Sequence, residues 1–217
     1  MGWVVAETWQ GPRYNPLADT ISDLQAATAP RVWFPIVCFA AGGLGTFGFA
    51  VFGLRPAWAG AVRLAPWAIG LSGLALGNSF PLIPCQLSAA GCTATGQLLT
   101  PGGLTDAILS GTALWALAIT PFPLSRLLAP LPRWSALAPL LRLAGMVAVV
   151  AYALLAISLL TGAWEGLFER VLVVVCQLWL GGLAVHLMRT SRRAPSPATG
   201  AAVGDPRPHG EVGEPRR

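Results

Sequence analysis

The chain has 217 residues, of which 54% are hydrophobic and only 11% are charged. A soluble domain carries about 25% charged residues, so this chain lacks the charge that a surface in water needs. The high apolar content also excludes a chain that is disordered throughout. The composition therefore predicts an integral membrane protein of the all-α class, built as a polytopic transmembrane helical bundle.

Five stretches of the chain are long enough and apolar enough to cross a membrane, which takes about 20 mostly apolar residues. Each is apolar all round, whereas a surface helix of a soluble protein has a polar face. We therefore expect five spans within a bundle over residues 31–190. The predicted spans run approximately over residues 32–54, 61–84, 104–128, 137–160 and 167–188.

The charged residues are divided unequally between the two ends of this predicted bundle. All 14 basic residues are Arg, and 11 of them fall at one end; only Arg13, Arg31 and Arg170 fall at the other. Basic residues gather on the cytoplasmic side of membrane proteins, so we expect a plasma-membrane protein with a cytoplasmic C-terminus and an N-terminus outside. The net charge of +5 then reflects topology, and binding of nucleic acid is not expected. The opposite, outer end receives six acidic residues, Glu7, Asp19, Asp23, Asp106, Glu165 and Glu169.

The two termini are predicted to lie outside the bundle. Residues 1–13 are too short for a span and lack the long apolar stretch of a signal peptide, so they are interpreted as an N-terminal lead. Residues 191–217 alternate Pro, Gly, Ala and charged residues without periodicity. A segment of this composition cannot bury enough apolar surface to fold, and we expect a disordered cytoplasmic tail.

The segment YNPLADTISDLQAA, residues 14–27, is the first with chemical interest. Leu17, Ile21 and Leu24 recur at helical spacing, and Thr20 precedes Asp23 by the three residues of a capping box. The pattern predicts an amphipathic helix over residues 14–30 that lies on the outer membrane interface. Two interpretations stay open: the acids of this helix are solvated, or Asp19 and Asp23 point into the mouth of the bundle and bind a polar group or cation.

The sequence YNPLADTISDL resembles the signature of the DUF998 family, a group of small bacterial and archaeal polytopic membrane proteins. The resemblance continues through FPLIPCQLSAAGC and GLFERVLVVVCQLW and covers about residues 14–188. It implies a six-spanning architecture, and it implies no known biochemical activity.

Two departures from the family pattern have consequences. The resemblance implies a span before Tyr14, and GWVVAETW is similar to the end of such a helix. We therefore expect the reading frame upstream of Met1 to encode about 15–20 further apolar residues, the length that completes a span; a stop codon directly upstream would contradict this. Relatives often carry a His at the start of the span that begins here at Leu104. This chain has Asp106 there, so His-dependent chemistry of the family is not expected.

The four cysteines fall into two groups. Cys85 and Cys92 share a predicted outer loop, where they either close a disulfide in an oxidising compartment or remain free thiols. Cys38 and Cys176 lie inside predicted spans, where Cys behaves as a small hydrophobic residue. No His and no second Cys pair accompany the loop cysteines, so neither a metal site nor a cofactor is expected.

Acidic residues also occupy the outer starts of two predicted helices, at Asp106 and Glu169. The helix dipole favours acids at these positions. Alternatively, Arg170 pairs with the adjacent Glu169 or bridges to Asp106 or Asp23, and the groups form a shared polar site. The resulting candidate ligand-binding residues are Asp19, Thr20, Ser22, Asp23, Asp106, Glu169 and Arg170. None of them is assigned a catalytic role.

Three functions remain after these exclusions. The two histidines, His186 and His209, lie on the cytoplasmic side, about 30 Å of hydrocarbon away from the outer acids, which excludes a three-His zinc site. No nucleophile elbow or phosphate-binding loop is present. We interpret the chain as a bundle that binds a lipid or small molecule, with membrane lipid as its partner. The alternatives are a lipid-modifying enzyme that uses the outer carboxylates and, less favoured, a small transporter. The pair Gly73 and Gly77 allows close helix packing within the monomer or in a homodimer.

Overall fold

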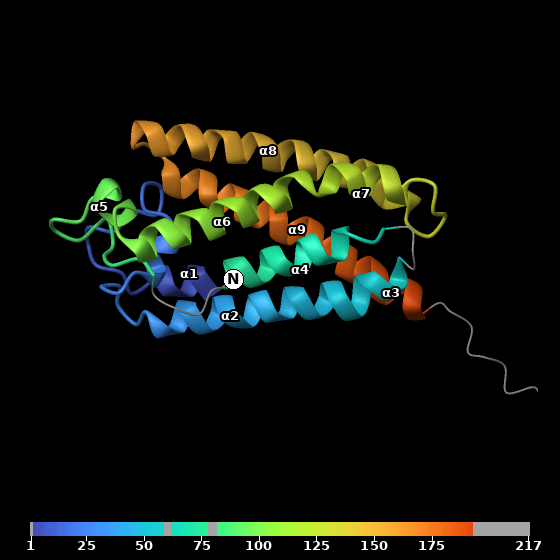
Figure 1. Ribbon diagram of the computed structural model, residues 1–217, viewed down its shortest axis with the longest axis horizontal. Coiled ribbons are helices and arrows are strands. Elements are labelled where there is room, and N and C mark those ends of the chain that lie inside the picture. Colours follow the sequence, from blue (N-terminus) through green and yellow to red (C-terminus); the bar gives the residue numbers. More distant parts are fainter. Residues whose placement is uncertain (1, 59–61, 78–81, 193–217) are drawn as a thin grey trace, which may run out of the picture.

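A computed structural model describes residues 2–58, 62–77 and 82–192. Within these ranges the chain is all-α and contains no strand. The helices lie side by side in one elongated bundle, with most of the loop structure gathered at one end (Figure 1). The predicted tail falls outside the described residues from residue 193 onward, and the last helix continues to Arg192.

Four helical stretches are long and apolar enough to cross a membrane. Their boundaries lie within four residues of four of the predicted spans, and they make the chain a multi-pass membrane protein. They comprise Trp33–Ala57, Pro101–Leu128, Ser135–Thr161 and Glu165–Arg192. The remaining predicted span contains the helix α4 (Ala65–Leu76) of 12 residues, which reaches only about 18 Å. Residues 78–81 of that span are outside the described ranges, so the predicted count of five spans is not confirmed.

The spanning stretches are continuous but not uniform. The first joins α2 (Trp33–Gly48), a π-helical segment η2 (Phe49–Leu54) and α3 (Arg55–Ala57). The others are α6 (Pro101–Ile119) with α7 (Pro121–Leu128), the 3₁₀ turn η3 (Ser135–Leu137) with α8 (Ala138–Thr161), and α9 (Glu165–Arg192). Pro occupies one of the first two positions in α4, α6, α7 and α8. Proline suits a helix start because the amide hydrogen that it lacks would have no partner there.

The predicted amphipathic helix over residues 14–30 is wrong. The segment forms turns and a single 3₁₀ turn, η1 (Ser22–Gln25). Side chains compete here with helical backbone bonds: Asn15 Oδ1 accepts a hydrogen bond from Leu17 N at 3.0 Å, and Asp19 Oδ2 accepts one from Asn15 N at 2.6 Å. Leu17 is 45% exposed, whereas Leu24 is fully buried. The segment therefore packs into the end of the bundle as a loop.

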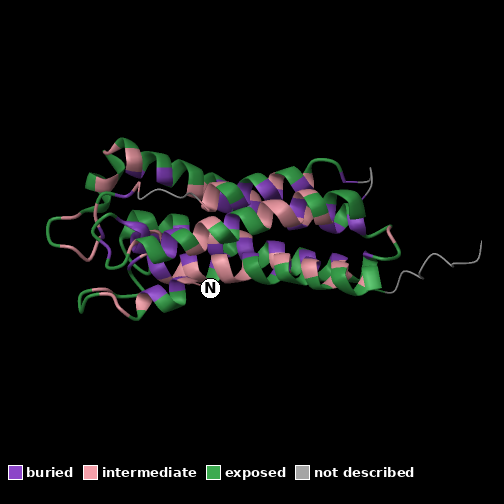
Figure 2. Ribbon diagram, turned by 90° about the horizontal axis from the view of Figure 1, so that it is seen from below, coloured by how far each residue is buried: buried purple, intermediate pink, exposed green. Residues whose placement is uncertain are grey.

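Two shorter helices complete the described fold. The first is α1 (Gly2–Glu7), which packs beside α2, and the second is α5 (Ala94–Leu98), which lies in the loops at the end of the bundle (Figure 1). The core between the helices is apolar, and the outer surface of the long helices is apolar as well. Phe52 is 80% exposed and Leu160 is 88% exposed, and exposed positions follow the outward faces of the helices (Figure 2). An apolar surface of this extent indicates contact with a membrane or a partner, and here it matches the hydrophobic spans.

Glycines of α2 and α4 form a close contact between these two helices. A Cβ atom on Gly43 would lie 2.5 Å from Gly73 O and 2.8 Å from Gly77 Cα. The small side of α4 that the sequence singled out therefore packs against α2 within the monomer, as is typical of membrane helices. The neighbouring Gly42 has no atom within 4 Å of such a Cβ.

We expect Gly43→Ala to separate α2 from α4 and to lower the free energy of unfolding by about 1–3 kcal/mol, because overpacking a tight contact carries a cost of this size. Thermal unfolding of the purified protein measures the loss. Gly42→Ala, one residue away, is the matched control and should unfold near the wild-type temperature. Equal melting temperatures for the two variants would show that the contact does not limit stability.

Candidate functional site

Five carboxylates are buried together at the end of the bundle that holds the loops, which we call the acidic end. Each of their side chains belongs to a residue that is 8% exposed or less. The five residues are Asp19, Asp23, Asp106, Glu165 and Glu169. Burial of a charged group is unfavourable unless hydrogen bonds or an opposite charge compensate it. The partners of these groups therefore determine what the acidic end can do.

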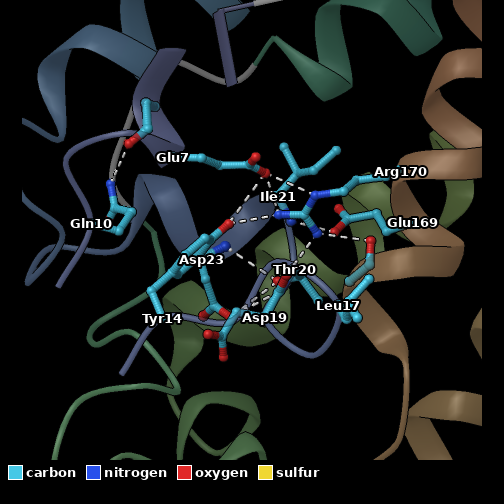
Figure 3. A network of polar contacts seen from close by, with 12 residues as sticks. Glu7, Gln10, Tyr14, Leu17, Asp19, Thr20, Ile21, Asp23, Glu169 and Arg170 are labelled. Carbon is cyan, nitrogen blue, oxygen red and sulfur yellow. Dashed lines mark hydrogen bonds and ion pairs between the residues drawn. The ribbon is translucent and has the colours of Figure 1, made fainter. Parts of the chain in front are cut away.

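Arg170, in the second turn of α9, is the centre of the polar network (Figure 3). Its Nε and Nη2 donate to Glu7 Oε1 at 2.8 and 2.5 Å, and Nη2 also donates to Tyr14 Oη at 2.6 Å. Its Nη1 donates to the backbone oxygens of Asp19 and Gly166, both at 2.8 Å. A guanidinium has five N–H donors, and these contacts use all five. Arg170 therefore ties α1 and the loop after it to α9.

This arrangement corrects the sequence-based expectation for Arg170. Its ion-pair partner is Glu7, and no salt bridge to Asp106 or Asp23 is found in the described part of the chain. Glu7 lies in the segment predicted to be an N-terminal lead, and nothing local in the sequence connects it to Arg170, 163 positions away.

Glu169 binds the backbone of the loop. Its Oε2 accepts a hydrogen bond from Ile21 N at 2.5 Å, and its Oε1 accepts one from Ser22 Oγ at 3.2 Å. The side chain is therefore not solvated at a helix end, as the dipole interpretation would have it, but buried between α9 and η1. It holds Ser22 and the start of η1 against α9.

Asp23 connects the same loop to the other side of the acidic end. Its Oδ2 accepts from Thr20 N, while Thr20 Oγ1 accepts from Asp23 N, at 3.3 and 3.2 Å. This is the reciprocal pattern of a capping box, formed without the expected helix. The Oδ1 atom accepts from Gln97 Nε2 at 3.2 Å and from Leu87 N at 3.4 Å. Burial raises the pKa of Asp23 above its ordinary value of 3.8, and the bonds from Gln97 and Leu87 oppose this shift in part.

The loop that contains the cysteines closes over the loop of Asp23. Cys85 and Cys92 form a disulfide with their Cα atoms 6.0 Å apart, which is one of the two alternatives that the sequence left open. Gln97 Nε2 donates to Cys85 O at 2.6 Å as well as to Asp23. Ala27 N donates to Ile83 O at 2.9 Å. The two loops therefore form one hydrogen-bonded cap on the acidic end.

The candidate residues share this end of the bundle without meeting at one point. The Asp19 carboxylate bonds within its own turn, through Asn15 N, and Asp106 on α6 interacts with Ser110 one turn further on. Within residues 2–58, 62–77 and 82–192, no group of three His, Cys, Asp or Glu residues could hold a metal ion. Asp19, Asp23, Asp106 and Glu169 thus each bond to different partners.

A cavity of about 190 Å³ lies beneath the cap, between α1, η1, α2, α4, α6 and α9. Its polar end is formed by Trp3, Ser22, Gln25 and Glu169. The rest of its wall is mainly apolar and rich in glycine. Gly42 on α2 and Gln177 on α9 both line the cavity and are both exposed, so the cavity reaches the outer surface of the bundle between these helices.

Two residues that line the cavity each carry a buried polar atom with no hydrogen-bond partner among the described residues. They are Gln25 Oε1 and Trp3 Nε1, on residues that are 9% and 8% exposed. An unpartnered buried polar group in a native structure requires an explanation such as a bound ligand or water. Neither residue was singled out from the sequence, because a single Gln or Trp in a short segment carries no pattern.

A sequence model of a family described as "Protein of unknown function (DUF998)" matches residues 1–186 of the chain. No curated protein and no solved structure matches the chain significantly.

Arg170→Lys should loosen the N-terminal segment, because an ammonium group cannot reproduce five bonds in a planar fork. Hydrogen bonds to charged groups contribute about 1.5–3 kcal/mol each, so the loss of even one makes the open segment at least about tenfold more populated. Trypsin cleavage after the exposed Arg13 measures that opening. Arg189→Lys, at the other end of the bundle, is the control, and cleavage at the wild-type rate in Arg170→Lys would contradict the role of this network.

The raised pKa of Asp23 makes stability depend on pH. The folded state binds this proton more tightly than the unfolded state, so the contribution of Asp23 to stability decreases as pH rises from about its ordinary value of 3.8 through its raised pKa. Asp23→Asn cannot ionise and should gain stability relative to wild type over that range. Melting temperatures between pH 4 and pH 8 measure the difference. A constant offset between wild type and Asp23→Asn over this pH range would refute the assignment.

Proposed function

The chain belongs to the DUF998 family, whose function is unknown, and we propose that it binds an amphiphile in the cavity beneath its cap. The amphiphile is a membrane lipid or a lipid-like small molecule. Its polar group lies against Ser22, Gln25 and Glu169, and its apolar tail lies along the glycine-rich wall between α2 and α9.

The observation that carries this proposal is the chemistry of the cavity lining. Small-molecule sites in proteins are mostly apolar, with a few polar groups that fix the orientation of the ligand. This cavity has that composition, and two of the residues that line it, Gln25 and Trp3, each carry a buried polar atom, Oε1 and Nε1, without a partner in the described chain. Each such atom costs about 1–3 kcal/mol. A ligand that bonds to them recovers part of this free energy.

The position of the opening supports a ligand that enters from the membrane. Gly42 and Gln177 lie at the surface within the apolar spanning stretches Trp33–Ala57 and Glu165–Arg192. An apolar tail can enter there without leaving the hydrocarbon. The absent side chain of Gly42 leaves room for it, since a Cβ atom at this position would contact nothing within 4 Å.

The candidate residues divide into two roles under this proposal. Ser22 and Glu169 line the cavity and contact the ligand. Asp19, Thr20, Asp23 and Arg170 do not line it and instead hold the cap in place. Asp106 also lies outside the lining. The same bonds disfavour a lipid-modifying enzyme, because the carboxylates of Asp19 and Asp23 are engaged within the cap.

We further propose that the acidic end faces the outside of the plasma membrane. The positive-inside rule supports this orientation, because the opposite end of the described bundle carries most of the arginines, among them Arg55, Arg126 and Arg189. The disulfide between Cys85 and Cys92 supports it too, since disulfides persist in oxidising compartments.

Two glycines of α2 provide the test. Gly42 and Gly45 are both exposed with open space at the Cβ position, but only Gly42 lines the cavity. We expect Gly42→Leu to fill the opening and to lower the affinity for a bound amphiphile at least about tenfold, a change of about 1.4 kcal/mol, while Gly45→Leu binds as wild type does.

The measurement is native mass spectrometry of the protein released from phosphatidylcholine nanodiscs after titration with three dodecyl compounds: dodecylamine, 1-O-dodecylglycerol and dodecyl phosphate. At least one of them should saturate at one molecule per chain. Absence of saturable binding would contradict the proposal; this is the result expected if another apolar helix occupies the opening. Equal binding by Gly42→Leu and wild type would also contradict it.

A further inference from the structure

The hydrogen-bonding atoms at the polar end of the cavity are mostly acceptors. Both oxygens of Glu169 accept a bond from η1, and each carboxylate oxygen can accept a second. Ser22 Oγ donates its hydrogen to Glu169, which leaves only its lone pairs for a ligand. Gln25 Oε1 is an acceptor without a partner in the described chain. Against these acceptors stand two neutral donor groups, Trp3 Nε1 and the amide nitrogen of Gln25.

Among the described residues, no side-chain cation at this end is left to bind a negative charge. All five N–H donors of Arg170 are used by Glu7, Tyr14 and two backbone oxygens. Arg31 lies over the ring of Trp9, 4.9 Å from its centroid, and neither it nor Arg13 lines the cavity. The backbone N–H of Ile21 is taken by Glu169. A phosphate would therefore lose its hydration and meet the Glu169 carboxylate without a compensating charge.

We infer that the cavity selects a headgroup that donates hydrogen bonds and carries no negative charge, an amine or a hydroxyl, and excludes anionic phosphate headgroups. This inference rests on the proposed function and specifies its ligand. An ammonium or a pair of hydroxyls offers two or three donors, which match Glu169, Gln25 Oε1 and Ser22 Oγ. A hydroxyl oxygen additionally accepts from Trp3 Nε1.

A series of amphiphiles with one tail and different headgroups tests the inference in the same nanodisc assay. Dodecylamine and 1-O-dodecylglycerol should bind at least about tenfold more tightly than dodecyl phosphate. Dodecyltrimethylammonium has the positive charge but no N–H donor, and it should bind more weakly than dodecylamine. Ethanolamine and glycerol, which have no tail, separate a lipid from a free polar molecule: they should not bind measurably, and binding as tight as that of the dodecyl compounds would overturn the lipid-like ligand.

Two variants connect the selectivity to named atoms. Gln25→Met removes the side-chain amide, and with it the acceptor Oε1, and should weaken the binding of dodecylamine and 1-O-dodecylglycerol about fivefold, the effect of one net hydrogen bond, without weakening that of dodecyltrimethylammonium. Gln10→Met removes an amide of the cap that does not line the cavity and is the matched control. Glu169→Gln removes the negative charge while keeping the shape, so the discrimination against dodecyl phosphate should shrink; this variant tests the inference even where Gln25→Met does not fold.

The outcomes separate the inference from the proposed function. Dodecyl phosphate could bind saturably and as tightly as dodecylamine, with this binding lost in Gly42→Leu. That result would overturn the headgroup selectivity and leave the proposal of amphiphile binding intact. An unchanged preference in both Gln25→Met and Glu169→Gln would also overturn it. Absence of saturable binding by every dodecyl compound would overturn both.

Discussion

The acidic end of the bundle depends on one largely enclosed cation, Arg170, and on the requirement that all of its donors be satisfied. A guanidinium that leaves water must replace its hydration with bonds in the correct plane. Glu7, Tyr14 and the backbone oxygens of Asp19 and Gly166 supply these bonds. They come from α1, from the loop after it and from α9. The N-terminal segment is thereby fixed over the bundle, although α1 has only six residues and would not form a stable helix alone.

This constraint explains why so many acids are buried with a single paired cation. The charge of Arg170 is matched by Glu7, so Asp19, Asp23 and Glu169 are stabilised mainly by hydrogen bonds from the loops. Glu169 receives Ile21 N and Ser22 Oγ, and Asp23 receives Gln97 Nε2. Each bond also orders a loop, so the cap and the carboxylates stabilise one another. The pKa of Asp23 is raised because its partners only partly replace water.

The cavity follows from the combination of this cap with the glycines of α2. At Gly43 the missing side chain lets α4 approach; at Gly42, one residue earlier, it leaves an opening toward α9. The cap adds Ser22 and Gln25 to the upper wall. The cavity thus has a polar end with fixed acceptors and an apolar wall that opens to the side. This polarity matches that of an amphiphile, and it links the packing of the bundle to the proposed function.

The sequence by itself determined the membrane class, four of the spans and the division of charge between the two ends, because each depends on local composition. It also contained the reciprocal pair of Thr20 and Asp23. It could not determine that residues 14–30 form a loop, because the side-chain bonds of Asn15 and Asp19 outweigh helical periodicity there. Only the tertiary structure paired Arg170 with Glu7, joined Cys85 to Cys92 and placed Gln25 and Trp3 at a cavity. Most of these contacts join segments that are distant in sequence, and the disulfide decides between two alternatives that the sequence left open. The free energy that favours them comes from burial, which cannot be predicted from a local sequence pattern.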